Sequence, residues 1–262
     1  TCANHIPKIE GSVSLVHMLT ELGGIECEAT ITKINKNKYY ALSGAIAEIH
    51  DHDWLFQNIL PDEKVSLRNV TDEYGVLVLA GPRSRDLLSK LTDADLSNAV
   101  FPWLRGKTIV VSGIKTLALR VSYAGELGWE LHIPMQNVKE LYDILMDEGS
   151  KFGITNFGTY AMNSLRMEKA YKGWGSELTT EITPIEAGLE RFVDFSKSFI
   201  GREATLSRKL LGINTKLVYM EVEADDTDCL GNEPVLNGDR IIGVTTSGAY
   251  GHSVKKSLAF AY

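Results

Sequence analysis

The segment from 76 to 152 constrains the fold most, because periods typical of strands and of helices alternate along it. In chain order its apolar patterns predict a strand, a helix, three strands and a second helix, at residues 76–80, 83–91, 108–111, 117–122, 129–133 and 138–152. Strands grouped with two helices in this order are typical of a two-layer α+β domain. We therefore expect residues 71–154 to form a small ferredoxin-like subdomain.

The residues before this segment predict a hairpin and a helix. Positions 26–34 alternate between polar and apolar side chains, and 39–42 resumes the apolar pattern after a polar interruption. Two such runs with a short break between them favour paired strands. Helical spacing of apolar residues over 51–60, ended by Pro61, predicts a helix.

The residues after this segment change from helix to strand. A helix is expected over 159–170, and from Leu217 onward strands alternate with turns such as Asn237-Gly238, a pair strongly favoured in tight hairpins. The last quarter is therefore expected to be all β. The chain starts with Thr1 rather than Met and ends in an apolar alternation over 258–262, so we expect it to be a piece of a longer protein.

Composition and charge argue against several classes of protein. The 262 residues are 44% hydrophobic and 23% charged, which is typical of a globular protein. Lys and Arg number 27 against 34 Asp and Glu, and the net charge of −7 argues against nucleic acid as a partner, since phosphate neutralisation needs a cationic face. No apolar run is long enough for a membrane helix, and no signal-peptide pattern opens the sequence. We therefore expect a soluble, cytoplasmic protein with no membrane partner.

Motifs for metals and nucleotides are incomplete. The three cysteines are widely spaced, which fits a reducing compartment and no zinc site, at Cys2, Cys27 and Cys229. His50-Asp-His-Asp53 contains ligand types, but consecutive helical residues point in different directions, so a solvated helix start is the favoured interpretation. Gly173-Trp-Gly175 follows a helix and lacks the third glycine of a dinucleotide fingerprint. We expect no metal, and no FAD, NAD or ATP held by the common motifs.

Segment 122–132 carries the most informative cluster of side chains. Two glycines bend the backbone between expected strands, and aromatic rings and carboxylates gather around them, at Tyr123, Glu126, Trp129 and Glu130. A carboxylate accepts paired hydrogen bonds from adjacent N–H groups of a heterocycle such as a pterin or purine, on which an aromatic ring stacks. The alternative is a polar hairpin with ordinary surface glutamates.

This segment also resembles a family signature. Residues 123–130 match Tyr-x-Gly-Glu-x-Gly-x-Glu, the pattern of the folate-binding aminomethyltransferases, the glycine-cleavage T-proteins. Within that superfamily, further segments resemble the C-terminal folate domain of dimethylglycine and sarcosine dehydrogenases, at residues 93–97, 156–169, 184–190 and 246–248. The resemblance runs from about Val13 to Tyr262 and does not separate sarcosine from dimethylglycine.

The resemblance implies three subdomains around a central folate cavity. Residues 1–70 with 155–205 would form a discontinuous first subdomain, 71–154 the ferredoxin-like one, and 206–262 a C-terminal β-barrel, truncated in its last strands. Such a protein would capture the carbon of an oxidised methylated amine donor on tetrahydrofolate, giving 5,10-methylenetetrahydrofolate. FAD would act only on a separate or missing flavin dehydrogenase domain or subunit, and a eukaryotic protein would work in the mitochondrial matrix.

The resemblance also assigns residues of a folate site. The family's pterin-binding glutamate falls on Glu130, and Tyr123 and Glu126 belong to the same signature. Leu131 and His132 would add backbone or side-chain contacts.

A second carboxylate is implied on another strand. The family carries an assisting aspartate in an Asp-Leu-Thr pattern, and the corresponding residues here are Glu28, Ala29 and Thr30. Glutamate keeps the charge and adds a methylene, so it can position or deprotonate a folate nitrogen if its geometry suits. The alternative is a solvent-facing glutamate on an edge strand.

Met162 and Arg166 are informative about whether the chain resembles the T-proteins or the dehydrogenases of this family. Met162 falls where T-proteins carry a folate-binding arginine, which favours the dehydrogenase branch. Arg166 would supply charge for the folate tail, or else form an ion pair with Glu168 or Glu177. Three rival functions stay open: a glycine-cleavage aminomethyltransferase fed by a lipoyl carrier, a folate-dependent demethylase, and a non-catalytic folate-binding regulatory module.

Overall fold

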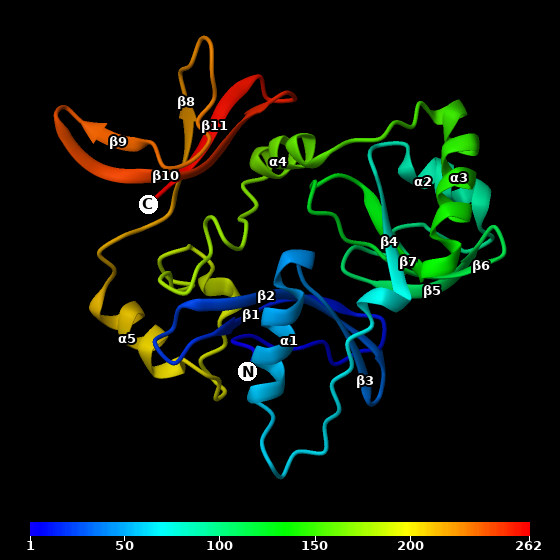
Figure 1. Ribbon diagram of the computed structural model, residues 1–262, viewed down its shortest axis with the longest axis horizontal. Coiled ribbons are helices and arrows are strands. Elements are labelled where there is room, and N and C mark those ends of the chain that lie inside the picture. Colours follow the sequence, from blue (N-terminus) through cyan, green and yellow to red (C-terminus); the bar gives the residue numbers. More distant parts are fainter.

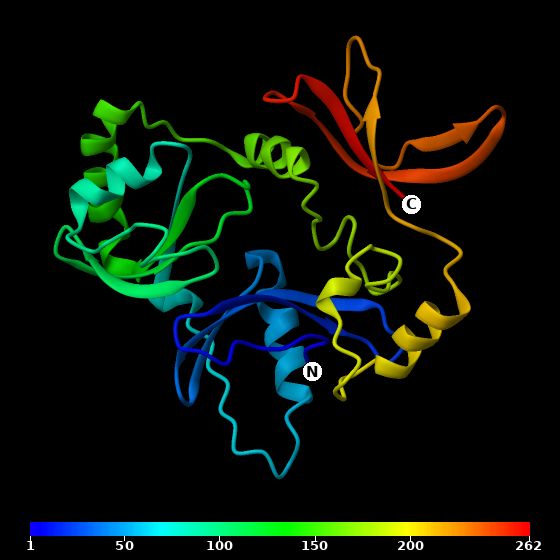
Figure 2. The same cartoon turned by 180° about the vertical axis from the view of Figure 1, so that it is seen from behind.

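The computed structural model describes residues 1–262 and is of the α+β class, as expected. It contains three antiparallel sheets with strand orders β1-β2-β3, β4-β7-β6-β5 and β8-β11-β10-β9. Figures 1 and 2 show the sheets as separate lobes, with helix α4 lying between the second and the third. Five short 3₁₀ helices lie in the connections between these elements, namely η1 (Ala45–Ala47), η2 (Thr71–Glu73), η3 (Met135–Asn137), η4 (Ser150–Phe152) and η5 (Glu190–Phe192).

The first sheet and one helix form the N-terminal lobe. Its elements are β1 (Val13–Leu19), β2 (Ile25–Asn35), β3 (Lys38–Leu42) and α1 (Glu48–Gln57). The predicted hairpin is confirmed as β2 and β3. Alternate residues of β2, including Cys27 and Ile31, pack with Trp54 and Leu55 of α1, so the helix covers one face of the sheet.

The second sheet carries both of its helices on one face. Its elements are β4 (Tyr74–Ala80), α2 (Ser84–Leu91), β5 (Gly106–Val111), β6 (Ile114–Leu119), β7 (Gly128–Pro134) and α3 (Val138–Gly149). The predicted order of strand, helix, three strands and helix is confirmed. The core of this lobe joins Trp129, Leu131 and Ile133 of β7 to Leu87, Leu88, Leu141 and Leu145 of the helices. Each such buried side chain contributes about 1.5–3 kcal/mol.

The chain then returns to the first sheet. The segment that follows α4 (Thr159–Glu168) lies beside the start of β2. There the backbone N–H of Ile25 donates to the carbonyls of Thr179 and Ile182, both at 3.0 Å. Leu178 and Leu189 pack on Ile25 in a buried cluster. These contacts support our proposal that 1–70 and 155–205 form one discontinuous subdomain, with 71–154 and 206–262 as the other two.

The third sheet is all β, as expected of the C-terminal quarter. Helix α5 (Arg202–Leu211) leads into β8 (Val218–Val222), β9 (Pro234–Asn237), β10 (Arg240–Gly251) and β11 (Lys256–Ala261). The turn between β9 and β10 contains Gly238 with φ of 60°, the left-handed conformation that the Asn-Gly pair predicts. Side chains of α4 hold this sheet, since Asn163 Nδ2 donates to the Gly248 carbonyl at 3.0 Å. None of the helices combines the length and the apolar character that a membrane span requires.

Candidate functional site

The candidate site lies where one face of the first sheet meets one face of the second. Alternation along β2 directs Glu28, Thr30 and Thr32 away from α1. Thr32 lies against β5, because a Cβ placed on the glycine that begins β5 would come within 3.1 Å of its methyl group. Tyr40 on β3 is the register partner of Thr32 on β2. The hydroxyl of Tyr40 lies 3.2 Å from Nδ1 of His132 on β7. Glu28 and Thr30 therefore occupy the face of β2 that turns toward the second sheet.

Glu130 and His132 project from β7 toward this face. Oε2 of Glu130 lies 3.4 Å from Nε2 of His132, and both atoms are buried without a hydrogen-bond partner. Burial is the main cause that raises the pKa of Tyr40, with smaller contributions from the neighbouring Tyr74 and from the negative charge of Glu130, so the Tyr40 hydroxyl stays protonated. Buried polar atoms are rarely left unpaired, and an exception indicates strain or a site for a ligand.

Leu131 does not belong to this group. It lies on the opposite face of β7, fully buried in the core, and its backbone pairs with Leu77 and Ala118 on the two sides. The side chain of Leu131 therefore points away from the site, and a folate contact from this residue stays a prediction for its backbone only. Trp129 also faces the core, where it meets Phe101 edge-on at a centroid distance of 6.1 Å. Its ring is not presented to the site.

Tyr123 lies in the loop between β6 and β7, and it approaches the return segment. Its hydroxyl donates to the Lys172 carbonyl at 3.1 Å, and its ring stacks on Tyr171 at 6.3 Å. Burial raises the pKa of Tyr123, and the negative charge of Glu28 acts in the same direction. Burial lowers the pKa of Lys172, while Glu28 acts to raise it. Tyr123 and Lys172 are therefore both within electrostatic range of Glu28.

Glu126 lies in the same loop and points elsewhere. Its Oε1 is 3.7 Å from Nζ of Lys169, and the side chains of Glu126 and Lys169 are 35% and 40% exposed. Gly125 beside it has φ of 70°, and a Cβ there would collide with the Lys169 side chain. The signature glycine thus allows the loop to turn closely over α4.

Glu28 is paired with a histidine that the sequence did not single out. Oε2 of Glu28 lies 2.8 Å from Nε2 of His17 on β1, the residue opposite it in the strand register. Thr30 shares this face and is half-buried. The side chain of Ala29 faces the other way, into the cluster under α1, so it does not contribute to the site. The sequence pattern did not predict β1 as a strand. Within its apolar run, His17 is the one ionisable residue, and that is the signal that could have identified it.

Arg166 is a structural residue in this fold. It is buried, and its Nη1 donates to Oε2 of Glu177 at 2.9 Å and to the Tyr171 carbonyl at the same distance. Its Nε donates to Asn163 at 2.9 Å. The alternative interpretation, an ion pair with Glu177, is confirmed, and the contact of Arg166 with a folate tail stays a prediction.

Glu177 joins three parts of the chain. It is fully buried and accepts hydrogen bonds from the Gly173 N–H at 2.8 Å, from Thr246 at 2.8 Å and from Ser247. Burial opposes its ionisation, but Arg166 and these donors outweigh burial and hold the pKa of Glu177 below its ordinary value. The glycine-rich loop at 172–175 thus wraps a carboxylate of its own chain.

A cluster with metal-ligand chemistry lies between β2 and α1. Ligand atoms of Cys27, His50 and Asp51 lie within 4.8 Å of one another. Two neighbouring helical residues therefore do converge, contrary to our expectation, because Cys27 reaches them from the strand. His50 contacts Asp51 at 3.0 Å and Glu26 at 2.8 Å, and burial raises the pKa of the Cys27 thiol. These polar groups satisfy one another, so the cluster gives no positive indication of an ion.

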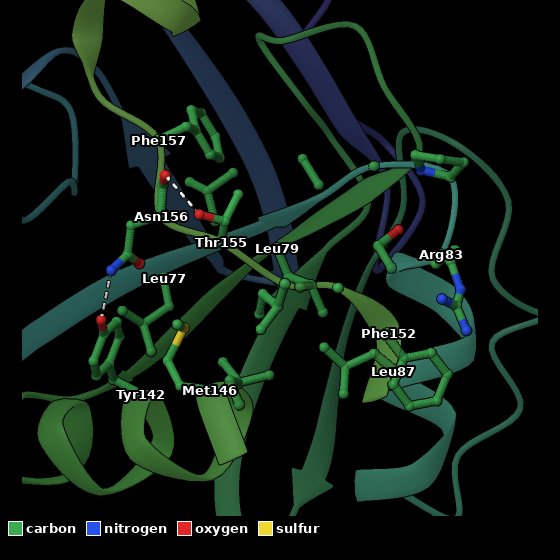
Figure 3. Close-up of a pocket in the computed structure, with 18 of the residues that line it drawn as sticks. Leu77, Leu79, Arg83, Leu87, Tyr142, Met146, Phe152, Thr155, Asn156 and Phe157 are labelled. Carbon is green, nitrogen blue, oxygen red and sulfur yellow. Dashed lines mark hydrogen bonds between the residues drawn. The ribbon is translucent and has the colours of Figure 1, made fainter. Parts of the chain in front are cut away.

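A cavity of about 670 Å³ opens at the free edge of β4. Figure 3 shows its walls, formed by β4, by α3 and by the segment after α3, which Asn156 Nδ2 fastens to the Tyr142 hydroxyl at 2.7 Å. Met162 of α4 also lines it. Arg83 is its only charged lining residue, so the cavity suits an apolar group better than an anion.

Comparison with known proteins shows which family has this architecture. The family model of the GCVT N-terminal domain matches residues 1–197, and the family model of the glycine cleavage T-protein C-terminal barrel domain matches residues 215–262. The chain belongs to the glycine cleavage T-protein family. A crystal structure of the glycine cleavage system aminomethyltransferase T from Bartonella henselae has the same fold, with a TM-score of 0.84 at 24% identity over 97% of this chain and 68% of that one.

Relatives within the family differ in length. Human mitochondrial dimethylglycine dehydrogenase is 44% identical over 99% of this chain, which spans only 30% of that protein. An aminomethyltransferase of Caldanaerobacter subterraneus is 32% identical over 98% of this chain and 69% of its own length. The chain thus matches most of a free-standing aminomethyltransferase and about a third of a dehydrogenase.

Proposed function

We propose that this chain performs tetrahydrofolate-dependent one-carbon transfer. The observation that carries the proposal is the pair of unpartnered polar atoms, Glu130 Oε2 and His132 Nε2, on the face of β7 that turns toward β2. A pterin ring offers adjacent N–H donors and ring acceptors, which is the complement of a carboxylate beside an imidazole. The residues present therefore fit the group that the family signature implies.

Each side chain has a distinct task in this proposal. Tetrahydrofolate supplies the amine nitrogens that accept the carbon. Glu130 and His132 orient the pterin through hydrogen bonds. Tyr123, in the loop between β6 and β7, borders the binding site on that side. Glu28 accepts a proton from a folate nitrogen as that nitrogen attacks an electrophilic iminium carbon, whose C=N π electrons move to the donor nitrogen. The donor nitrogen then takes up a proton and leaves as the demethylated amine, while a second folate nitrogen bonds the same carbon and loses its own proton. Because the reactants carry the electrons for this step, orientation and proton acceptance are what the protein contributes.

The carbon source is inferred from the relatives. With 44% identity to dimethylglycine dehydrogenase, we propose that the carbon comes from oxidised dimethylglycine or sarcosine and leaves as 5,10-methylenetetrahydrofolate. FAD would then belong to another domain or subunit, because this chain carries no common flavin fingerprint. The name of the human relative includes the word mitochondrial, which supports a mitochondrial location in a eukaryote, and we propose the matrix as the site of action.

Titration with tetrahydrofolate tests the proposal. The wild-type chain should bind it, and Glu130→Ala should weaken binding at least tenfold, since a charged hydrogen-bonding partner is lost. Glu140→Gln, an exposed carboxylate on α3, is the matched control and should leave affinity unchanged. Unchanged affinity in Glu130→Ala would remove the pterin assignment.

A second candidate is aminomethyl transfer from a lipoyl carrier. It is favoured by the match to most of the Caldanaerobacter aminomethyltransferase. Formation of methylenetetrahydrofolate from an aminomethylated lipoyl protein, with no flavin dehydrogenase present, would select this candidate. Tetrahydrofolate binding without turnover in either assay would select a regulatory module.

A further inference from the structure

His17 is held in the middle of the first sheet in an unusual environment for an ionisable side chain. It is completely buried on β1, and its ring meets Phe192 edge-on at a centroid distance of 5.5 Å. Nδ1 is also buried and has no hydrogen-bond partner. The only polar contact of the ring is therefore Nε2 with Oε2 of Glu28, at 2.8 Å.

These contacts define the direction of the hydrogen bond. A neutral imidazole carries its proton on one nitrogen, and Nδ1 has no acceptor to which it could donate. The tautomer that satisfies the contact therefore has the proton on Nε2, which donates to the Glu28 carboxylate. The edge contact with Phe192 keeps the ring from turning away.

The same contact leaves the two carboxylate oxygens of Glu28 in different states. Oε2 is occupied by His17, whereas Oε1 receives no hydrogen bond from the protein. The Glu28 side chain is 21% exposed, so Oε1 remains open to a ligand on this face of β2. One oxygen is thus anchored and the other is free to accept a proton.

We propose that His17 is a positioning residue for Glu28, an inference that rests on the function proposed above. Glutamate has one more rotatable bond than the aspartate that the family signature implies at this place, and a longer side chain samples more rotamers. The His17 hydrogen bond removes that freedom by fixing Oε2, so that Oε1 faces the folate nitrogen. His17 compensates for the added methylene and does not itself touch the substrate.

A double-mutant cycle on the full chain tests this. The reaction mixture contains a flavin dehydrogenase that oxidises dimethylglycine, and the readout is the rate of methylenetetrahydrofolate formation at saturating tetrahydrofolate. His17→Phe keeps the ring but loses the donor, and we expect a rate about tenfold lower with the Kd for tetrahydrofolate within about twofold. His17→Gln restores a donor and should recover most of the rate.

The coupling to Glu28 separates positioning from a general structural role. Glu28→Gln should lower the rate, and adding His17→Phe to it should cost little more, because the group being positioned has already lost its function. Thermal unfolding checks that the variants fold, and the His17→Gln arm serves if His17→Phe does not. Multiplicative losses in the double variant, or a wild-type rate in His17→Phe, would overturn the inference. A wild-type chain that fails to bind tetrahydrofolate would instead overturn the proposed function.

Discussion

Two buried polar clusters in this molecule differ in how completely the protein satisfies them. Around Glu177, a guanidinium, a backbone N–H and hydroxyl groups supply hydrogen bonds from α4, the glycine-rich loop and β10. Around Glu130, one carboxylate oxygen and one imidazole nitrogen face each other without partners. Both clusters contain residues that the family resemblance associates with folate, yet only the second has hydrogen-bonding capacity left for a ligand.

Hydrogen-bond satisfaction separates the structural residues of this protein from the candidate binding residues. A buried ion pair that the protein completes by itself holds segments together, whereas an incomplete polar group carries a desolvation cost that a ligand can relieve. On this criterion Arg166 stabilises the junction of the first and third lobes, and Glu130 with His132 retains hydrogen-bonding capacity for a ligand. Substitutions in the two clusters should therefore affect different measurements.

The largest effect is expected from Arg166→Met. Removing the guanidinium leaves the fully buried Glu177 without its ionic partner, and breaking such a pair typically costs about 3–5 kcal/mol. Denaturant unfolding followed by circular dichroism measures the change. Arg68→Met, which removes an exposed ion pair with Glu73, is the control and should change stability little. Equal stabilities for the two variants would show that the Glu177 cluster is not structural.

Glu130→Ala should show the reverse profile. The unfolding free energy should change little, because no hydrogen bond within the protein is lost from Oε2, while tetrahydrofolate affinity falls by about 1.5–3 kcal/mol. Calorimetric titration and denaturant unfolding of the same preparation measure both quantities. A large loss of stability with intact affinity would place Glu130 in the structural class.

The pH dependence of stability offers a third contrast. The pKa of Glu177 is lowered in the folded protein, so its contribution is fully present above the ordinary value of 4.5 and is lost as pH falls through the folded pKa. Unfolding free energies measured from pH 6 downward should therefore decline more steeply for the wild type than for Glu177→Gln. Parallel slopes would argue against an ionised Glu177, whatever the absolute stabilities of the two proteins.

Sequence patterns predicted what depends on local periodicity. The hairpin of β2 and β3, the order of elements from β4 to α3 and the Asn-Gly turn all follow from alternation or turn chemistry. The same rule, applied within the signature, would have separated Leu131 from its neighbours, because successive residues of a strand face opposite sides. The resemblance grouped Leu131 with Glu130 and His132 by adjacency alone, and the strand places it in the core.

Partners distant in sequence could not be predicted in this way. The Glu177 cluster depends on hydroxyls of β10, and the His17 contact depends on the register of β1 against β2. Both are set by tertiary packing, and β1 itself lacks the regular alternation that identifies a half-buried strand. Cys27 joined His50 and Asp51 for the same reason, since a strand and a helix had to be packed before their side chains met.

The smallest effect is expected from Glu126→Gln, which tests how far the comparison extends within the signature. Glu126 differs from both clusters because its carboxylate is solvated and lies 3.7 Å from Lys169 at the molecular surface. Exposed pairs of this kind contribute little, so stability should stay within about 0.5 kcal/mol of the wild type. Tetrahydrofolate affinity should change less than twofold if only unsatisfied buried groups bind the pterin. A loss of affinity comparable to that of Glu130→Ala would mean that the loop closes on the ligand and releases Glu126 from Lys169. Unsatisfied hydrogen bonding in the free protein would then cease to identify the binding residues.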